Sequence, residues 1–342
     1  MVTRSEQPFD GLGPDVVLSA AESLGLEPDG RLFALNSYEN RVYRLGLDES
    51  PPGQGSDLPG VVADAVVLKF YRSGRWSDAQ IQEEHDFGAE LSRAELPVAA
   101  PWYFDGRSLH RHLQFRFAAF ACRSGGAPEL DAAGARQLLG RTLGRIHAIG
   151  ALQPFRHRNR IDATQYGERL RRELLQLAII PAPMDERYAA VSDELVTRIR
   201  GAFEQAADIA HIRVHGDCHL GNILWNQTGP VFVDLDDSIQ GPRIQDMWMF
   251  LSGDKGQQRS EWAALLEGYE QFTSFDFREV ALIEPLRALR MMAHAAWLAA
   301  RWNDPAFPRA FPWFAEGRYW DRHIADLQEQ LEILDDPPLL RL

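Results

Sequence analysis

Five polar side chains stand close together between residues 214 and 225, in the stretch VHGDCHLGNILW. Asp217 and Asn222 are five residues apart, so one loop can direct a carboxylate at an acceptor hydroxyl and a metal-binding amide oxygen beside it. Asp234 follows twelve residues after Asn222, where the apolar run PVFV ends, and can supply a second oxygen to the same metal. This order and spacing favour phosphoryl transfer from a nucleotide.

Two other interpretations of the same stretch stay open. His215, Cys218 and His219 could bind zinc, although no further cluster of cysteine or histidine completes a tetrahedral set. Asp217 and Asn222 could also be ordinary turn residues, because both types are common in turns. We favour phosphoryl transfer because the oxygen-bearing residues occur together in the order that this chemistry needs.

Lysine is rare in this chain, since only Lys69 and Lys255 occur among 36 basic residues. The chain uses arginine at nearly every other basic position, so each lysine is a candidate for a contact that an ammonium makes better than a guanidinium. Chance retention of a lysine during evolution is the alternative in each case. Lys69 stands in the apolar stretch VVLKF, where a charge is costly unless it meets an anion. Its setting resembles that of the strand lysine that holds the α- and β-phosphates in kinases.

The helix expected after this strand offers Glu83 and Glu84 as ion-pair partners for Lys69. We favour Glu84, because it falls near the same helical face as Ile81. Lys255 lies in the sequence GDKG, which we expect to form a turn between two helices. A contact with negative charge near the acceptor is one interpretation of Lys255, and a plain loop lysine is the other.

Strands and one helix must position Lys69 in the first part of the chain. Ser77 and Asp78 are expected to cap the helix, and the proline- and glycine-rich residues 48–60 are expected to form a long exposed loop. The expected elements are a helix over 14–26, strands over 31–37, 41–47 and 63–72, a helix over 77–96 and a strand over 114–126.

From residue 131 onward the pattern is mainly helical, and short strands carry the candidate catalytic residues. We therefore predict an α+β fold with a small, strand-rich, nucleotide-binding lobe at 1–124 and a larger catalytic and substrate lobe at 125–342. The expected helices span 132–150, 167–178, 193–206, 245–253, 261–272, 278–302 and 321–334, and the expected strands lie within 211–217, 221–226 and 230–237.

The composition is ordinary for a globular enzyme, with 342 residues of which 45% are hydrophobic and 25% charged. The net charge of −13 argues against nucleic acid or an anionic membrane surface as a partner, because both attract clustered lysine and arginine. We find neither a signal segment nor an apolar run of about 18 residues, and only two cysteines occur. We therefore expect a cytoplasmic protein, and a monomer.

The chain resembles the aminoglycoside phosphotransferase and choline kinase group of kinase-like folds, and within that group the bacterial, eukaryotic-like Ser/Thr protein kinases. The resemblance covers nearly the whole chain except both ends and residues 48–62, and it implies a bilobal, protein-kinase-like fold. The matching stretches are LNSYENRVY, VLKFYR, EEH, LPVAAP, LGRIH, HGDCHLGNILW, VDLDD, QDMWM, GDKGQQR, EPLRALR and RWNDPAFPRAFPW.

The resemblance also implies ATP as co-substrate, Mg²⁺ as cofactor and a role for each matching residue. Asp217 would be the catalytic base, Asn222 and Asp234 the magnesium ligands, Lys69 with Glu84 and Ser37 would lie at the nucleotide phosphates, and Phe120 and Cys122 would lie against adenine. LNSYEN stands where protein kinases have a glycine-rich loop, and VDLDD stands in place of Asp-Phe-Gly. No long activation loop follows, so we do not expect regulation by loop phosphorylation.

These residues and the resemblance predict an ATP-dependent kinase that phosphorylates Ser or Thr hydroxyls of proteins, in a stress response. The expected partners are ATP and a protein substrate, without nucleic acid or membrane. One alternative is a kinase for a small hydroxyl compound such as an aminoglycoside, choline or homoserine, which the acidic composition would suit. Another is a nucleotide-binding pseudokinase, which the joint presence of Lys69, Asp217, Asn222 and Asp234 disfavours.

Overall fold

The computed structural model describes residues 7–49 and 60–336, so residues 50–59 of the predicted loop lie outside the described part. The chain divides into two compact units. The first unit comprises Met1–Arg158, His215–Ser238 and Ala263–Ser274, and the second comprises Asn159–Val214, Ile239–Trp262 and Phe275–Leu342. The boundary at residue 124 between a nucleotide-binding lobe and a catalytic and substrate lobe stays a prediction.

The first unit contains a five-stranded antiparallel sheet with the strand order β1-β2-β3-β5-β4. The strands are β1 (Pro28–Leu35), β2 (Arg41–Leu47), β3 (Val61–Phe70), β4 (His110–His112) and β5 (Phe115–Arg123), and the helices are α1 (Pro14–Glu22), α2 (Asp78–Arg93) and α3 (Ala135–Gly150). The predicted strands and helices of this segment are confirmed. The sequence did not predict β4, because three residues are too few to show a strand pattern.

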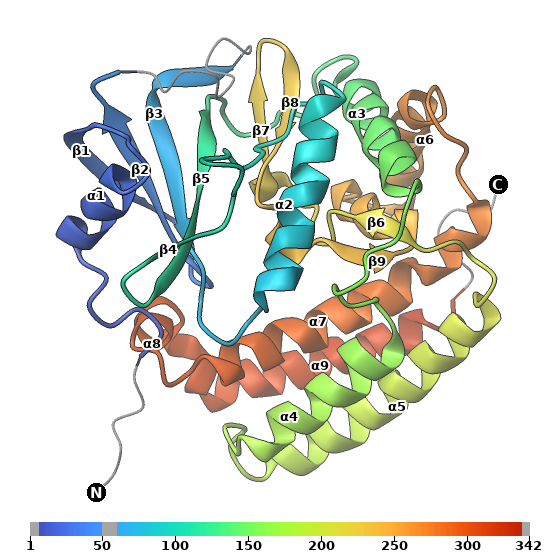
Figure 1. Cartoon of the computed structure of the whole chain (residues 1–342). Helices are drawn as coiled ribbons and strands as arrows, with labels where there is room; N and C mark the ends of the chain where they lie inside the picture. The colour runs from blue at the N-terminus through green and yellow to red at the C-terminus, as the bar shows by residue number, and fades with distance from the viewer. Residues whose placement is uncertain (1–6, 50–59, 337–342) are drawn as a thin grey trace, which may run out of the picture. The chain divides into compact units, whose positions relative to one another are not determined.

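The alternation of side chains along the strands separates an apolar core from the face that carries Lys69. Leu68, Phe70 and Phe117 lie in one apolar cluster with Val17 of α1. Lys69 stands between Leu68 and Phe70 in β3, so its side chain points to the opposite face. The helix α2 lies on that opposite side of the sheet (Figure 1).

The helix α2 begins with the cap that its sequence predicts. The Ser77 hydroxyl accepts the backbone N–H of Gln80, and the Gln80 side chain accepts the backbone N–H of Ser77. This reciprocal pair satisfies two N–H groups that the first helical turn leaves without partners. The buried positions of the helix are Ile81, Glu84, His85, Phe87, Gly88 and Leu91. The carboxylate of Glu84 therefore lies on the buried face of α2.

The helices α3 and α6 (Lys255–Tyr269) approach each other closely through glycines. A Cβ atom at Gly140 of α3 would lie 1.9 Å from the carbonyl oxygen of Leu265 in α6, a separation that real Cβ atoms do not reach. His147 is buried at the same contact, and its Nδ1 lies 2.9 Å from the Tyr269 hydroxyl. His147 is therefore a core histidine whose ring has a hydrogen-bond partner.

We expect Gly140→Ala to lower the free energy of unfolding by about 1–3 kcal/mol or more, because the added methyl group forces the two helices apart. The matched control is Gly201→Ala in α5 (Met184–Gln205), where a Cβ atom would have no heavy atom within 4 Å. That change should stabilise the helix by about 0.5–1 kcal/mol. Thermal and urea unfolding would measure both, and equal stabilities of the two variants would contradict the close packing.

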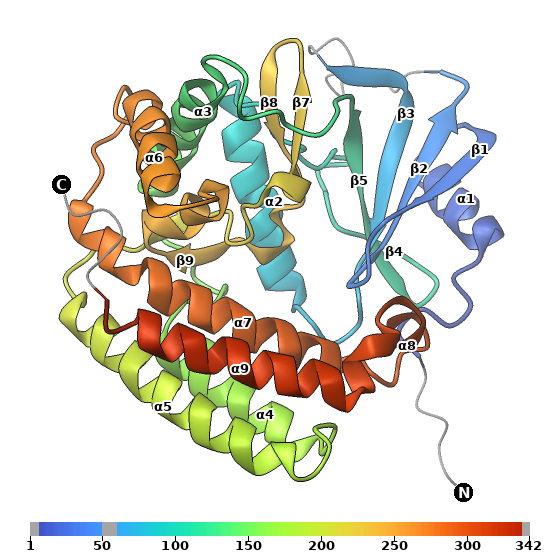
Figure 2. The same cartoon turned by 180° about the vertical axis from the view of Figure 1, so that it is seen from behind.

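The second unit is mainly helical. Its elements are α4 (Leu170–Gln176), α5, α7 (Ile283–Ala300), α8 (Ala306–Ala310), α9 (Gly317–Ile333) and the short strands β6 (Ile212–Val214) and β9 (Ile239–Gly241). The helices α4, α5, α7 and α9 pack side by side (Figures 1 and 2), and the buried rings of Tyr188 in α5 and Trp320 in α9 meet edge to face. Within residues 7–49 and 60–336, no helix combines the length and apolarity that crossing a bilayer requires.

The helix predicted at 245–253 is wrong. The segment forms two 3₁₀ turns instead, Arg243–Asp246 and Trp248–Phe250. Such turns close hydrogen bonds over three residues and are typical of pieces too short for an α-helix. Lys255 is the first residue of α6, so the turn that the sequence predicted around it ends before the lysine.

Candidate active site

The Lys69 ammonium lies among three carboxylates. Its Nζ is 3.0 Å from Asp234 Oδ1, 3.1 Å from Asp236 Oδ1 and 3.5 Å from Glu84 Oε1, and the side chain is only 7% exposed. Burial by itself lowers the pKa of Lys69, but these carboxylates outweigh burial and hold the pKa well above its ordinary value. The site therefore keeps a charged ammonium at the end of β3.

Glu83 and Glu84 have different partners, although they are neighbours in α2. The Glu84 carboxylate lies between the Lys69 ammonium and the Arg158 guanidinium, whose Nη2 is 3.1 Å from Oε2. The Glu83 carboxylate instead accepts the backbone N–H groups of residues 156–158 at 2.6–2.9 Å. Burial raises the pKa of Glu84 to about 7, although Lys69 and Arg158 oppose the rise.

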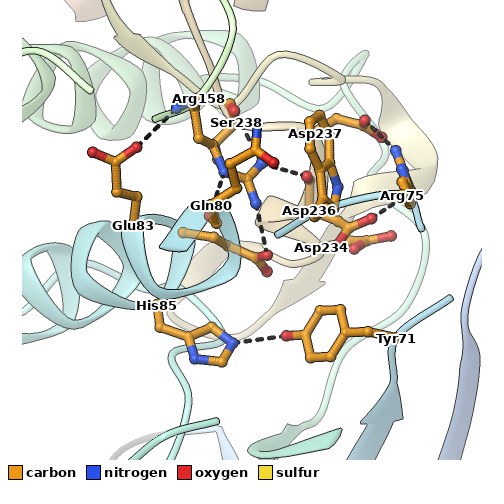
Figure 3. A network of polar contacts seen from close by, with 12 residues as sticks. Tyr71, Arg75, Gln80, Glu83, His85, Arg158, Asp234, Asp236, Asp237 and Ser238 are labelled. Atoms are coloured by element: carbon orange, nitrogen blue, oxygen red, sulfur yellow. Dashed lines mark hydrogen bonds and ion pairs between the residues drawn. The ribbon is translucent and has the colours of Figure 1, made fainter. Parts of the chain in front are cut away.

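Two arginines, which the sequence interpretation did not assign to the site, enclose the carboxylates (Figure 3). The Arg75 guanidinium donates one hydrogen bond to Asp236 and another to Asp237. Arg158 donates to the backbone carbonyls of Asp236 at 2.5 Å and Ser238 at 3.1 Å. The signal for this network was the run of three acids in VDLDD together with Arg75, six residues after Lys69, whereas no local signal marked the distant Arg158.

Asp236 is the buried member of the three acids. Burial alone raises the pKa of this carboxyl, but the cations of Lys69, Arg75 and Arg158 outweigh burial and hold the pKa below its ordinary range. Asp236 therefore stays ionised and neutralises the buried cations around it. An unpaired charge at this depth would be costly, and the mutual pairing removes much of that cost.

The hairpin of β7 (Ile223–Asn226) and β8 (Gly229–Phe232) brings Asn222 next to Asp234. Ile223 pairs with Phe232 in the hairpin. The backbone N–H of Val233 then donates to the carbonyl of Asn222 at 3.0 Å, so the two candidate metal ligands lie at the open end of the hairpin, Asn222 before β7 and Asp234 after β8. Asn222 and Asp234 are twelve residues apart in the sequence, and the tight hairpin between them brings them together.

The loop that carries Asp217 is tied to the same strand end. The His215 ring is buried, and its Nε2 donates to the Val233 carbonyl at 2.9 Å. The next residue, Gly216, has a φ of 86°, a left-handed conformation that glycine adopts at little cost. These two residues turn the chain so that Asp217 stands beside the hairpin end.

Asn222 holds the Asp217 backbone and leaves its own amide oxygen available. Its Nδ2 donates to the Asp217 carbonyl at 2.9 Å, and Oδ1 accepts no hydrogen bond within the described ranges. The Asp217 carboxylate is 28% exposed and lies 3.4 Å from Nε2 of His219. A partly exposed carboxylate beside an available amide oxygen can serve an acceptor hydroxyl and a cation at the same time.

The structure does not support a zinc site at His215, Cys218 and His219. In the described part of the chain, no group of three or more His, Cys, Asp or Glu side chains could hold a metal ion. Cys218 is fully buried. His219 uses Nδ1 to accept the backbone N–H of Gly221 at 2.9 Å. The polar residues of this stretch therefore serve the loop and its carboxylate.

Asp234 has a strained backbone and a carboxylate that solvent reaches. Its φ of 58° and ψ of 66° lie in the left-handed region, which is uncommon for a residue with a Cβ and often marks functional positions. The side chain is 51% exposed. The half-exposed carboxylate and the Asn222 Oδ1 are hard oxygen donors, a pair that fits a Mg²⁺ ion completed by phosphate oxygens and water.

The turn between β1 and β2, residues 36–40, contains Ser37. The turn is attached to the site from both sides, since Arg72 donates to the Glu39 carbonyl at 2.9 Å and Asn40 Nδ2 donates to Asp236 Oδ2 at 3.1 Å. Asn40 Oδ1 in turn accepts the backbone N–H of Arg72 at 3.1 Å. The turn that replaces a glycine-rich loop is thus fixed by side chains.

The sheet face around Lys69 carries apolar residues that solvent reaches. Strand register places Lys69 opposite Ala118, and Val67 opposite Phe120, so Phe120 and Cys122 of β5 share the face of the lysine. Phe33 and Leu35 lie on the same face at the exposed strand β1. An apolar surface beside a buried ammonium suits a ligand with a flat ring at one end and anionic groups at the other.

Lys255, the other lysine, forms an exposed ion pair with Asp336 in the second unit, with 3.4 Å between Nζ and Oδ2. Exposed pairs of this kind contribute only about 0–1 kcal/mol. Its contact with an acceptor stays a prediction.

The match to a known family shows the class of protein to which the chain belongs. Residues 33–283 match the phosphotransferase enzyme family, and the chain belongs to this family. The predicted resemblance and the α+β, kinase-like fold class are confirmed. The chain is therefore a phosphotransferase of the kinase type.

Curated relatives are similar over almost their whole length. The chain is 42% identical to "Stress response kinase A" of Shigella flexneri and of Escherichia coli (strain K12), over 97% of this chain and 96% of each relative. It is also 42% identical, with the same coverage, to "Serine/threonine protein kinase RdoA" of Salmonella typhimurium.

Solved structures share the fold at lower identity. The amicoumacin kinase hAmiN, in a complex with AMP-PNP, Ca²⁺ and Ami, has a TM-score of 0.69 and 20% identity, with 96% of this chain and 95% of that chain covered. The choline kinase LicA of Streptococcus pneumoniae has a TM-score of 0.63 and 13% identity, with 93% and 98% covered. At these identities the likeness concerns the fold.

Proposed function

We propose that this chain transfers the γ-phosphoryl group of ATP, with Mg²⁺, to Ser or Thr hydroxyls of proteins. The observation that carries the proposal is the grouping of a buried ammonium with Asp217, Asn222 and Asp234 at one hairpin end. A non-catalytic nucleotide-binding module would have no use for all four groups together. Phosphoryl transfer needs placement and charge stabilisation above all, and these side chains supply both.

Each residue has a distinct task in the proposed reaction. Lys69 binds nucleotide phosphate oxygens, with Ser37 near them, and Glu84 holds the ammonium in place. Phe120 and Cys122 lie on the apolar surface that receives adenine. The Asp217 carboxylate accepts a hydrogen bond from the acceptor hydroxyl and takes its proton while the oxygen attacks the γ-phosphorus and the bond to the bridging oxygen of ADP breaks.

Asn222 Oδ1 and the Asp234 carboxylate would hold the magnesium ion. When bound, the ion neutralises the charge of the phosphate oxygens. Asp234 would then exchange its contact with Lys69 for the ion. The amicoumacin kinase complex contains Ca²⁺ and a nucleotide analogue, which supports a divalent cation of this kind.

We expect Asp234→Ala to weaken nucleotide binding about ten-fold or more in the presence of Mg²⁺ and to change it little in EDTA. The reason is that the variant removes a metal ligand but leaves Lys69 with Glu84 and Asp236. Calorimetric titration with ADP under both conditions measures the difference. An equal loss with and without Mg²⁺ would contradict the assignment of Asp234 to the metal.

The name of the Salmonella relative, "Serine/threonine protein kinase RdoA", supports a protein acceptor, and the names of the other relatives support a role in a stress response. A cytoplasmic location and a monomeric state stay predictions from the sequence. A second candidate is a kinase for a small hydroxyl compound. It is favoured by the amicoumacin and choline kinases among the similar structures and by the partly exposed Asp217 and half-exposed Asp234 carboxylates.

Incubation with γ-labelled ATP and a mixed panel separates the two candidates. The panel contains Ser- and Thr-bearing proteins together with choline, homoserine and an aminoglycoside, and the Asp217→Asn variant controls for contaminating kinases. We expect label on serine or threonine of protein. Label on a small alcohol alone would overturn the protein acceptor, and no label above the variant would favour the pseudokinase alternative.

A further inference from the structure

We propose that Asp236 is a positioning residue that holds the Lys69 ammonium at the nucleotide phosphates after Asp234 has turned to the metal. The inference rests on the proposed function, because that function assigns the phosphates to Lys69. Asp236 is not among the residues that act in the proposed reaction, which are Lys69, Glu84, Asp217, Asn222 and Asp234.

The two oxygens of the Asp236 carboxylate have separate partners. Oδ1 lies 3.1 Å from Lys69 Nζ. Oδ2 accepts hydrogen bonds from Arg75 Nη1 and from Asn40 Nδ2. The arginine and asparagine therefore fix the orientation of the carboxylate, and the remaining oxygen faces the lysine.

The backbone of Asp236 is fixed as well. It lies in the short 3₁₀ turn Leu235–Asp237, and its carbonyl accepts a hydrogen bond from the fully buried Arg158 guanidinium. Arg158 also donates to the carbonyl of Gln80 in α2 at 2.8 Å. Figure 3 shows Arg158 between Gln80 and Asp236. Arg158 thus links Asp236 to α2, the helix that also carries Glu84.

Lys69 needs a carboxylate partner that stays in contact with it when Asp234 binds the metal. Asp234 is its nearest carboxylate, at 3.0 Å, but this side chain is half exposed and belongs to the proposed metal site. Glu84 lies farther away, at 3.5 Å, and is shared with Arg158. Asp236 is buried and close, so it keeps the ammonium in place when Asp234 leaves.

The same contacts argue against Asp236 as a metal ligand. Its side chain is only 3% exposed. Both of its oxygens already face cationic or amide donors, and a metal ion would have to displace at least one of them. The neighbouring Asp237 has no contact with Lys69 among the described residues, although it shares Arg75 with Asp236. Asp237 is therefore a matched control, one residue away.

Calorimetric binding of ADP and of adenosine tests the inference, because adenosine lacks the phosphates that Lys69 would contact. We expect Asp236→Asn to weaken ADP binding about ten-fold or more in the presence of Mg²⁺ and less in EDTA, where Asp234 keeps its contact with Lys69, and to leave adenosine binding within about two-fold. Asp237→Asn should leave both ligands within about two-fold. In steady-state kinetics, Asp236→Asn should raise the KM for ATP and leave the KM for the acceptor unchanged.

The charge-compensated variant Arg75→Gln/Asp236→Asn is used if Asp236→Asn does not fold. It removes one charge of each sign, keeps amide groups that can pair with each other, and should show the same selective loss of ADP binding. Equal losses for ADP and adenosine, or unchanged ADP binding, would overturn the inference alone. Failure of the unsubstituted chain to bind ATP would overturn the proposed function and the inference together.

Discussion

Replacement of Asp217 by asparagine is expected to lower kcat by about 10²–10⁴-fold while ADP and ATP bind as tightly as before. The substitution keeps the size of the side chain but removes the oxygen charge that receives the proton of the acceptor hydroxyl. The loop should keep its shape, because Asn222 and Val233 hold it through the Asp217 backbone and the His215 ring.

The measurements are single-turnover phosphoryl transfer and calorimetric nucleotide binding. Asp131→Asn is the matched control, since this aspartate is 98% exposed, and it should behave as the unsubstituted chain. Near-normal transfer by Asp217→Asn would show that another group accepts the proton. A parallel loss of nucleotide affinity would show instead that the substitution disturbs the hairpin end.

Lys69→Arg is expected to be nearly as damaging as Lys69→Met, and each should lower kcat/KM for ATP by about 10²–10³-fold. The ammonium is a compact point charge that fits among three carboxylates in an almost closed space. A guanidinium is planar and wider. The remaining oxygens of Asp236 and Glu84 are already occupied by the guanidinium groups of Arg75 and Arg158, so a third one has no room.

Lys255→Arg serves as the control for this pair, because Lys255 stands in an exposed ion pair where either cation suffices. We expect its kinetics to be unchanged on ATP. Kinetic comparison of the three variants at saturating acceptor, with circular dichroism to confirm folding, gives the answer. A Lys69→Arg enzyme with substantial activity would mean that this lysine persisted by drift.

Local sequence patterns predicted most of the elements and the spacing of the candidate catalytic residues. Period-two patterns marked the strands around Lys69, and the Ser77 cap marked the start of α2, because such signals depend on neighbours within a few residues. The spacing of Asp217, Asn222 and Asp234 likewise predicted a phosphoryl-transfer loop. The placement of Asn222 beside Asp234 followed from a short hairpin, which local sequence encodes well.

Local sequence could not show which carboxylates surround Lys69, because they come from segments far apart in the chain. Glu83 and Glu84 differ by one step along α2, yet Arg158 and the backbone at 156–158, more than 70 residues away, give them different partners. Sequence showed three acids in VDLDD but not that Asp236 is the buried one. Burial of a charge depends on cations gathered from distant segments, since only their combined field offsets the loss of hydration, and that gathering exists only in the folded chain.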